Sequence, residues 1–484
     1  MAAEGKMAAR PPRSLTEIAG QIPSESVYSP SLLELVATQL RDVGNLATAG
    51  HGEDSAAFSR LAHFARSFLT PLPACPGSPE DKDRSRCRQL SMSALYHLTT
   101  AFEASLDDHV LLAIIPYSDR AFVSPTDVIT GLAPEILSRQ FSRRSKSDFI
   151  VSVVLESAIR PHLSKWSSSR LTATGRVAAY EDSAPTGVAA DLDASPPWVG
   201  ECSTMIPLFQ WALNESDPTL LKNHWSSFTP FLLALLDDAN TGSRAHGLRA
   251  AEVFIRKCPP WILAERGIGT VLEEAMLPTL QFLPSHTPEA ESVQLLEPAY
   301  TALVLLARTR FSYDCDMLAK RSLLDRLLRE GIFSAYSYAS EYVRIIEVLA
   351  EKAKLIIEEL GIYAAKHLKD IIPMFCGVMM DPFLAQYSRC LLVVALALRS
   401  TVLTCWPRVF GHYTAEILRS TIVCWLNVCD SPTKGQTTDE GDLKGTLRNI
   451  ATLLSNGCGG VNEGPLAGLC EMIEDKPELG AILH

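Results

Sequence analysis

Apolar side chains between residues 223 and 284 recur with the period of an α-helix. In the first part of this stretch they fall three or four positions apart and share one helical face: Phe228, Phe231, Leu232, Leu235 and Leu236. Asp237 and Asp238 end the run, a short turn follows, and Ser243 is expected to cap a second amphipathic helix. Such a pair cannot bury its apolar face alone, so the pattern predicts neighbouring pairs of the same kind.

The helical period continues along most of the chain. Its clearest example is residues 341–361, where Ile, Leu and Ala form one stripe, Glu and Lys occupy the other face, and Gly361 stands at the expected helix stop. No run alternates apolar and polar residues with the period of two that marks a strand. The sequence therefore predicts an all-α protein.

Three prolines interrupt apolar helical runs at Pro230, Pro278 and Pro373. Their spacings are near one and two periods of about 47 residues, which is typical of HEAT or armadillo repeats. Within such a repeat we expect turn residues at five positions: Asp237, Asp238, Arg244, Gly247 and Asp381. The unit expected near residue 325 has no proline, so the prediction is an irregular HEAT/armadillo-like helical-repeat solenoid, with a non-repeating helical bundle as the alternative.

Composition shifts divide the chain into four regions. Residues 1–30 are expected to be a flexible N-terminus, and residues 31–166 an N-terminal helical region. The segment 167–197 is rich in Ser, Ala, Gly and Pro and is interpreted as a low-complexity linker or insertion. Residues 198–484 are expected to form a C-terminal HEAT-like array, interrupted by a flexible loop at 431–442.

Charge and cysteine usage restrict the possible partners and compartments. With a net charge of −11, the 484-residue chain has no global basic field for nucleic acid or an anionic membrane. The longest apolar run, 390–398, is far shorter than the roughly 20 residues of a membrane span. Twelve cysteines without a CxxC pair suit a reducing compartment, and the N-terminus lacks the apolar region of a secretory signal. We expect a protein of the cytoplasm and also of the nucleus.

The sequence offers no motif for catalysis. It lacks the GxxxxGK[ST] phosphate loop, the GxSxG elbow and the HExxH zinc motif, and its histidines are dispersed. The paired aspartates at 107–108 and 237–238 are interpreted as helix-terminal and turn residues. We therefore expect no enzyme activity, no catalytic residues, no cofactor and no metal.

Two blocks of the helical region carry a more specific pattern. They read FLLALLDDANTGSRAHGLRAAEVFI and GIGTVLEEAMLPTLQFLPSHTPEAESVQLLEPAYTALVLLARTRF. The first contains LLxLLDD followed by Arg244 and Gly247, and the second places Gly267 and Gly269 before LPTLxxLP. In the order and spacing of these features, over roughly residues 200 to 400, the chain resembles the Tti-two family (Tel-two-interacting protein two).

This resemblance implies a non-enzymatic scaffold subunit of the TTT cochaperone complex, with Tti-one and Tel-two proteins as partners. The complex acts beside the ninety-kilodalton heat-shock chaperone and the R-two-T-P complex. It supports the phosphatidylinositol-3-kinase-related kinases of DNA-damage checkpoints and TOR signalling. Two tryptophans near prolines, Trp261 and Trp406, are candidate partner contacts, with ordinary helix packing as the alternative. The alternative function is a HEAT-repeat adaptor of another class, such as a transport or phosphatase-regulatory scaffold.

The assignment of the first apolar face yields a test. Leu232→Asp places a charge among apolar side chains, which should lower the free energy of unfolding by several kcal/mol. Thermal unfolding followed by circular dichroism measures the effect. A variant that melts like the parent would show that Leu232 does not belong to the buried face.

Overall fold

Every regular element that the structure describes is a helix, and no strand occurs within its described ranges. The structure is a computed structural model that describes residues 14–23, 29–43, 54–69, 79–102, 104–119, 129–163, 198, 204–311, 316–430 and 438–457. The prediction of an all-α fold is confirmed. The chain divides into two compact units, Met1–Leu232 and Leu233–His484, so the boundary falls inside one helix, α10 (Pro218–Leu236).

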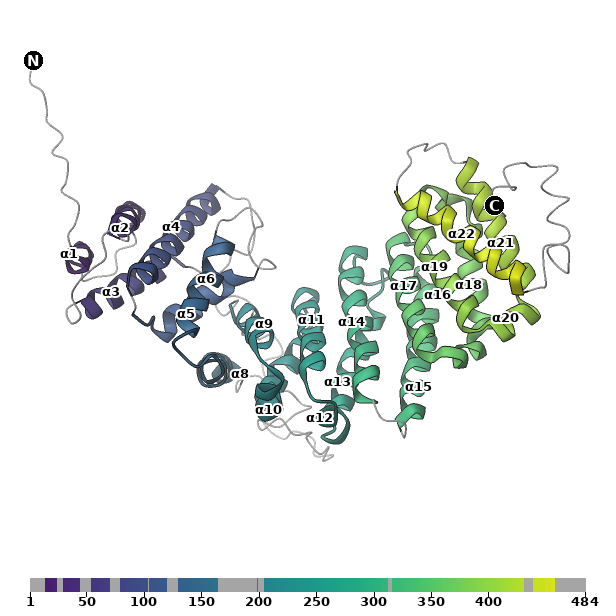
Figure 1. The fold of residues 1–484 in the computed structure, drawn as a ribbon, viewed down its shortest axis with the longest axis horizontal. Helices are drawn as coiled ribbons and strands as arrows, with labels where there is room; N and C mark the ends of the chain where they lie inside the picture. The colour runs from purple at the N-terminus through teal and green to yellow at the C-terminus, as the bar shows by residue number, and fades with distance from the viewer. Residues whose placement is uncertain are drawn as a thin grey trace, which may run out of the picture. The chain divides into compact units, whose positions relative to one another are not determined.

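Unit 1 is built from helices that pack on one another along the chain, from the 23-residue α4 to helices of a single turn (Figure 1). Helix α4 packs against α2 and α3 and also against α6, while α9 packs against η1 and η2. The helices of this unit are α1 (Leu15–Gly20), α2 (Pro30–Val43), α3 (Asp54–Arg66), α4 (Pro79–Ala101), α5 (Asp108–Ile114), η1 (Ile115–Ser118), α6 (Ile129–Phe141), α7 (Lys146–Asp148), η2 (Phe149–Ile159), α8 (Arg160–Leu163), α9 (Met205–Glu215) and the first part of α10.

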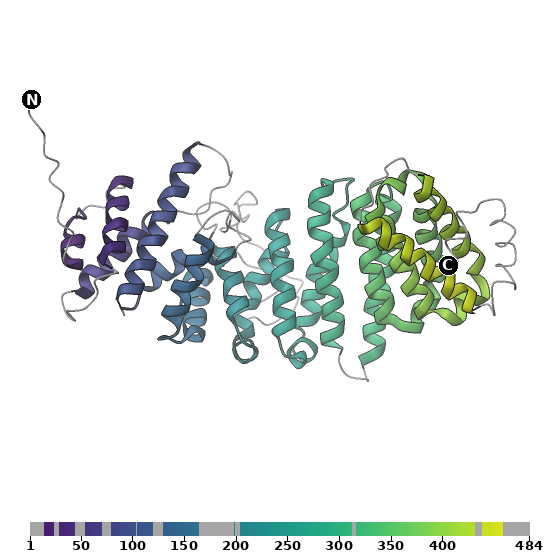
Figure 2. The same cartoon turned by 45° about the horizontal axis from the view of Figure 1, so that its top comes forward.

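Unit 2 is built mainly from successive helix pairs (Figure 2). Its helices are α11 (Thr241–Lys257), α12 (Pro260–Glu265), α13 (Ile268–Met276), η3 (Leu277–Gln281), α14 (Glu289–Arg310), α15 (Met317–Arg326), η5 (Leu327–Phe333), α16 (Ser334–Ala339), α17 (Val343–Leu360), η6 (Gly361–His367), α18 (Leu368–Met380), η7 (Pro382–Gln386), α19 (Ser388–Thr404), α20 (Trp406–His412), α21 (Thr414–Asp430) and α22 (Thr438–Gly457).

The second helices of these pairs form a ladder. Helix α11 packs on α14, α14 on α17, α17 on α19 and α19 on α22, while α18 packs on α21 among the first helices. The ladder helices begin at residues 241, 289, 343, 388 and 438. These spacings agree with the repeat of about 47 residues that the prolines predict. The structure thus has the stacked pairs of an irregular HEAT/armadillo-like array.

The prolines explain part of the irregularity. Pro230 and Pro373 lie inside α10 and α18, whereas Pro278 is the second residue of the 3₁₀ segment η3. The unit without a proline departs from the α-helix in another way, because residues 327–333 form a π-helix. A π-helical turn widens the backbone by one residue and shifts the register of the following helix. The repeat is therefore irregular in backbone geometry as well as in sequence.

Three predicted boundaries need correction or stay open. Residues 15–20 form α1 with Leu15 and Ile18 buried, so the prediction of a flexible N-terminus is wrong there. Residues 438–442 begin α22, so the predicted loop 431–442 is wrong in its second half, and 431–437 lie outside the described residues. Acidic side chains at Asp439 and Glu440 favour a helix start because they face the positive end of the helix dipole. The segment 167–197 also lies outside the described residues, and the boundary placed there stays a prediction.

The first helix of the opening pair is buried as its pattern predicts. Phe228, Phe231 and Leu232 are fully buried, and the Phe231 ring packs edge-on against Phe209 at 4.9 Å between centroids. The cap of α11 is different from the prediction. Asn240 is the N-cap, since its Oδ1 accepts a hydrogen bond from the Ser243 N–H at 3.0 Å, and Ser243 lies inside the helix.

Gly247 allows α11 to approach the end of α10 closely. A Cβ atom at Gly247 would lie 2.8 Å from the Leu235 Cβ and 3.0 Å from the Leu235 carbonyl carbon. Both distances are shorter than van der Waals contact, and the Leu235 carbonyl carbon belongs to the backbone, which cannot move aside easily. Any side chain at this position would push the two helices apart.

Gly247→Ala should therefore destabilise the protein by about 1 kcal/mol or more through overpacking. The matched control is Gly445→Ala in α22, where a Cβ would meet nothing within 4 Å. There the better helix propensity of alanine should raise stability by up to about 1 kcal/mol. Urea unfolding of both variants measures the difference, and equal effects at the two positions would contradict the close approach.

Candidate functional site

The turn between α10 and α11 is held by a buried polar cluster. Asp238 is buried, and its Oδ1 accepts the Asn240 N–H at 2.9 Å. The Arg244 Nε donates to the Asp238 carbonyl oxygen at 2.9 Å. The Arg244 guanidinium also lies over the Phe282 ring, 4.6 Å from its centroid. Asp238 and Arg244 thus tie the turn to the segment after η3, whereas Asp237 is exposed.

Asp381 forms a similar turn after α18. Its Oδ1 accepts the Phe383 N–H at 2.9 Å, two residues along the chain, and caps η7. The basic residue at the start of the following helix, Arg389, lies 3.9 Å from Glu347 in α17. The aspartate of the turn therefore recurs at Asp381, whereas its arginine partner has a different role.

The two glycines of the GlyIleGly sequence have separate structural roles. Gly267 has a left-handed backbone with φ of 76°, which glycine adopts without strain, and it is the N-cap of α13. At Gly269 a Cβ would lie 2.5 Å from the Leu263 carbonyl oxygen and 2.7 Å from the Arg310 Cδ. Both glycines therefore shape the α12–α13 corner.

The two candidate tryptophans differ in exposure. Trp406 begins α20 and is 59% exposed. Trp261 is partly buried, and the Arg266 guanidinium lies over its ring at 5.7 Å. Trp406 thus offers the larger free aromatic surface, and the assignment of either residue as a partner contact stays a prediction.

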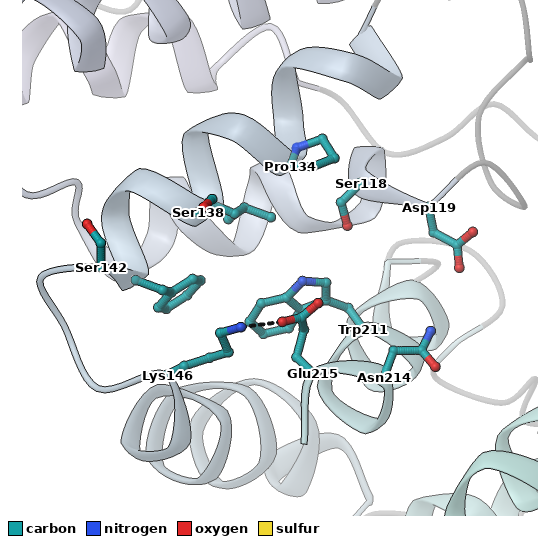
Figure 3. Close-up of a pocket in the computed structure, with 11 residues that line it drawn as sticks. Ser118, Asp119, Pro134, Ser138, Ser142, Lys146, Trp211, Asn214 and Glu215 are labelled. Carbon is teal, nitrogen blue, oxygen red and sulfur yellow. Dashed lines mark hydrogen bonds and ion pairs between the residues drawn. The ribbon is translucent and has the colours of Figure 1, made fainter. Parts of the chain in front are cut away.

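Unit 1 contains a hollow of about 870 Å³, the unit 1 hollow, lined by residues of η1, α6, α7 and α9. The rings of Phe141 and Trp211 pack against each other at 5.5 Å and form part of its apolar wall. Lys146 and Glu215 form an ion pair beside the Trp211 ring (Figure 3). The spacing of residues within one helix does not predict this hollow, because its walls come from separate helices.

Two serine hydroxyls of the unit 1 hollow are engaged by the backbone of their own segments. Ser118 and Ser142 donate their hydroxyls to the carbonyl oxygens of Ile115 and Arg139, each at 2.7 Å. No histidine or cysteine occurs among its described lining residues. In the part of the chain that the structure describes, no three His, Cys, Asp or Glu side chains form a metal-binding group.

Several cysteines lie in the core of unit 2 as small apolar side chains. Burial raises the pKa of the Cys376, Cys390 and Cys424 thiols to about 12 and that of Cys405 to about 11. These groups stay protonated near neutral pH, and a thiol is a poor nucleophile compared with a thiolate. Their placement agrees with a packing role.

No helix within the described ranges combines the length and the apolar character needed to cross a membrane.

An all-α protein whose helix pairs stack on one another is a helical-repeat protein. The model of the Tti2 family matches residues 110–386, more than half of the chain. The chain belongs to the Tti2 family, as the sequence resemblance indicates, and the match begins at residue 110, well before the region of roughly 200 to 400 that carries the resembling motifs. No curated protein matches the chain, and no solved structure matches it.

The turn cluster yields a stability test. Arg244→Met should lower the free energy of unfolding by about 2 kcal/mol, because it leaves the buried Asp238 carbonyl without this donor. The control is Arg256→Met on the same helix, where an exposed ion pair with Glu252 should contribute less than about 1 kcal/mol. If both variants unfold at the same urea concentration, Arg244 does not hold the turn.

Proposed function

We propose that the chain is a non-catalytic scaffold subunit of the TTT cochaperone complex, assembled with Tti-one and Tel-two proteins. In this role it supports the folding, stability and assembly of phosphatidylinositol-3-kinase-related kinases, beside the ninety-kilodalton heat-shock chaperone and the R-two-T-P complex. The site of action is the cytoplasm and the nucleus. Membership of the Tti2 family is the observation that carries the proposal.

The stacked pairs of unit 2 supply a physical basis for a scaffold. Each pair contacts mainly its neighbours, so the helices present extended ridges on which a second helical protein can lie. Permanent complexes of this kind commonly bury about 2,000 Å² or more, with an apolar centre. Large apolar side chains are available on this unit's surface: Leu318, Tyr338, Phe383, Leu403 and Trp406.

The polar clusters support a structural role over a catalytic one. Arg244 and Asp238 are committed to a turn, and the cysteine thiols of unit 2 are protonated in its core. The serines of the unit 1 hollow donate to backbone carbonyls. These groups are therefore engaged in holding the helices, which leaves surface contact as the activity that the fold supports best.

Co-expression with Tti-one and Tel-two proteins tests the proposal. The tagged chain should recover both partners in near-equal amounts through size-exclusion chromatography at physiological salt. Cells depleted of the chain should lose phosphatidylinositol-3-kinase-related kinases, and re-expression should restore them. Elution of the chain as a monomer in the presence of both partners, with unchanged kinase levels, would overturn the proposal.

A further inference from the structure

Unit 2 has a groove of about 510 Å³ beside the turn that follows α18, here called the aspartate groove. Three aromatic side chains contribute to its lining. Phe383 is 81% exposed and Tyr387 is 45% exposed, while Tyr336 of α16 is partly buried. Apolar rings this open to solvent, gathered around one hollow, are typical of a surface that a partner covers.

The charges of the aspartate groove are all negative. Glu341 and Asp381 are its only charged lining residues, and neither forms an ion pair within the described part of the chain. The neighbouring arginines, Arg344 and Arg389, both favour the charged form of Glu347, which lies outside the lining of the groove. The groove therefore presents two carboxylates that form no ion pair with a side chain of the described residues.

The field of Asp381 reaches the aromatic wall. Burial first, and then the negative charge of Asp381, raises the pKa of the Tyr336 hydroxyl. The negative charge that disfavours a Tyr336 phenolate would attract a cation that enters the groove. The Asp381 carboxylate is oriented against the backbone of η7, because its Oδ1 accepts the Phe383 main-chain N–H.

The backbone of α18 forms an open part of the groove at Gly377. A Cβ atom there would find only the Tyr336 hydroxyl, at 4.0 Å. An alanine would fit without strain, whereas a larger side chain would project into the hollow. The position therefore offers a way to fill the groove without disturbing the core.

We propose that the aspartate groove binds an arginine side chain of a partner protein, carried on a segment with apolar neighbours. This inference rests on the proposed function and names the chemistry of one docking point. A guanidinium stacks on aromatic rings and pairs with carboxylates in the same plane, which suits rings and acids that face one hollow. Lysine can make the charge contact but lacks the planar, stacking head group.

The main test compares two substitutions at one position, using the purified pair of Tti-one and Tel-two proteins as the probe. Gly377→Leu fills the groove and should weaken binding at least tenfold, while Gly377→Ala should bind within twofold of the parent. Both should melt at or above the parent's temperature, because each replaces a helix-interior glycine. If Gly377→Leu binds the pair as tightly as the parent does, the aspartate groove is not a binding site. The proposed complex would still stand in that case, because the chain would still bind the Tti-one and Tel-two proteins.

Charge substitutions supply a second measurement that does not depend on filling the groove. Glu341→Gln combined with Asp381→Asn removes both charges and keeps an amide oxygen to accept the Phe383 N–H. The double variant should bind at least tenfold more weakly and lose most of the salt dependence of binding. Unchanged affinity with unchanged salt dependence would contradict a basic ligand.

A peptide-binding experiment tests the arginine site independently of the proposed complex. A labelled helical peptide with one central arginine should bind the full chain in fluorescence anisotropy, and the same peptide with neutral citrulline should bind at least fivefold more weakly. Gly377→Leu should abolish the difference between the two peptides. If the parent shows no preference for arginine over citrulline, the groove is not an arginine site, whatever the chain assembles with.

Discussion

An amphipathic helix pair buries its apolar face only when another pair covers it, and unit 2 is organised around this constraint. Its ladder helices α11, α14, α17, α19 and α22 pack in succession. Fully buried side chains such as Phe254, Tyr300 and Ile356 recur from one rung to the next. Stability is thus distributed along the ladder, and each pair depends on its neighbours more than on one central core.

Aspartates close two of the turns in unit 2. Asp238 and Asp381 both accept a backbone N–H two residues along the chain, which closes the turn without exposing unpaired backbone groups. The two turns then diverge. Asp238 is buried and its carbonyl oxygen accepts a hydrogen bond from Arg244, whereas Asp381 lines the aspartate groove. The same aspartate turn therefore supports packing at one position and a charged surface at the other.

Much of the fold could be predicted because helical periodicity is a local property. The stripe of residues 341–361 becomes α17, and Gly361 ends it with a φ of 57°, as a helix-stopping glycine allows. The prediction of Ser243 as the N-cap is wrong because Asn and Ser are nearly equal cap formers. Only the backbone geometry shows that Asn240 is the N-cap of α11. The start of α22 was missed because its first turn is polar.

The sequence by itself determined the helical class, the approximate repeat and the family, since each depends on residue order and spacing along the chain. Only the tertiary structure decided where the surfaces lie. The wall of the unit 1 hollow joins Phe141 of α6 to Trp211 of α9, and the aspartate groove joins Tyr336 of α16 to Phe383 of η7. These residues are neighbours because helices pack side by side, and no spacing within one helix encodes which residue of another helix will face it.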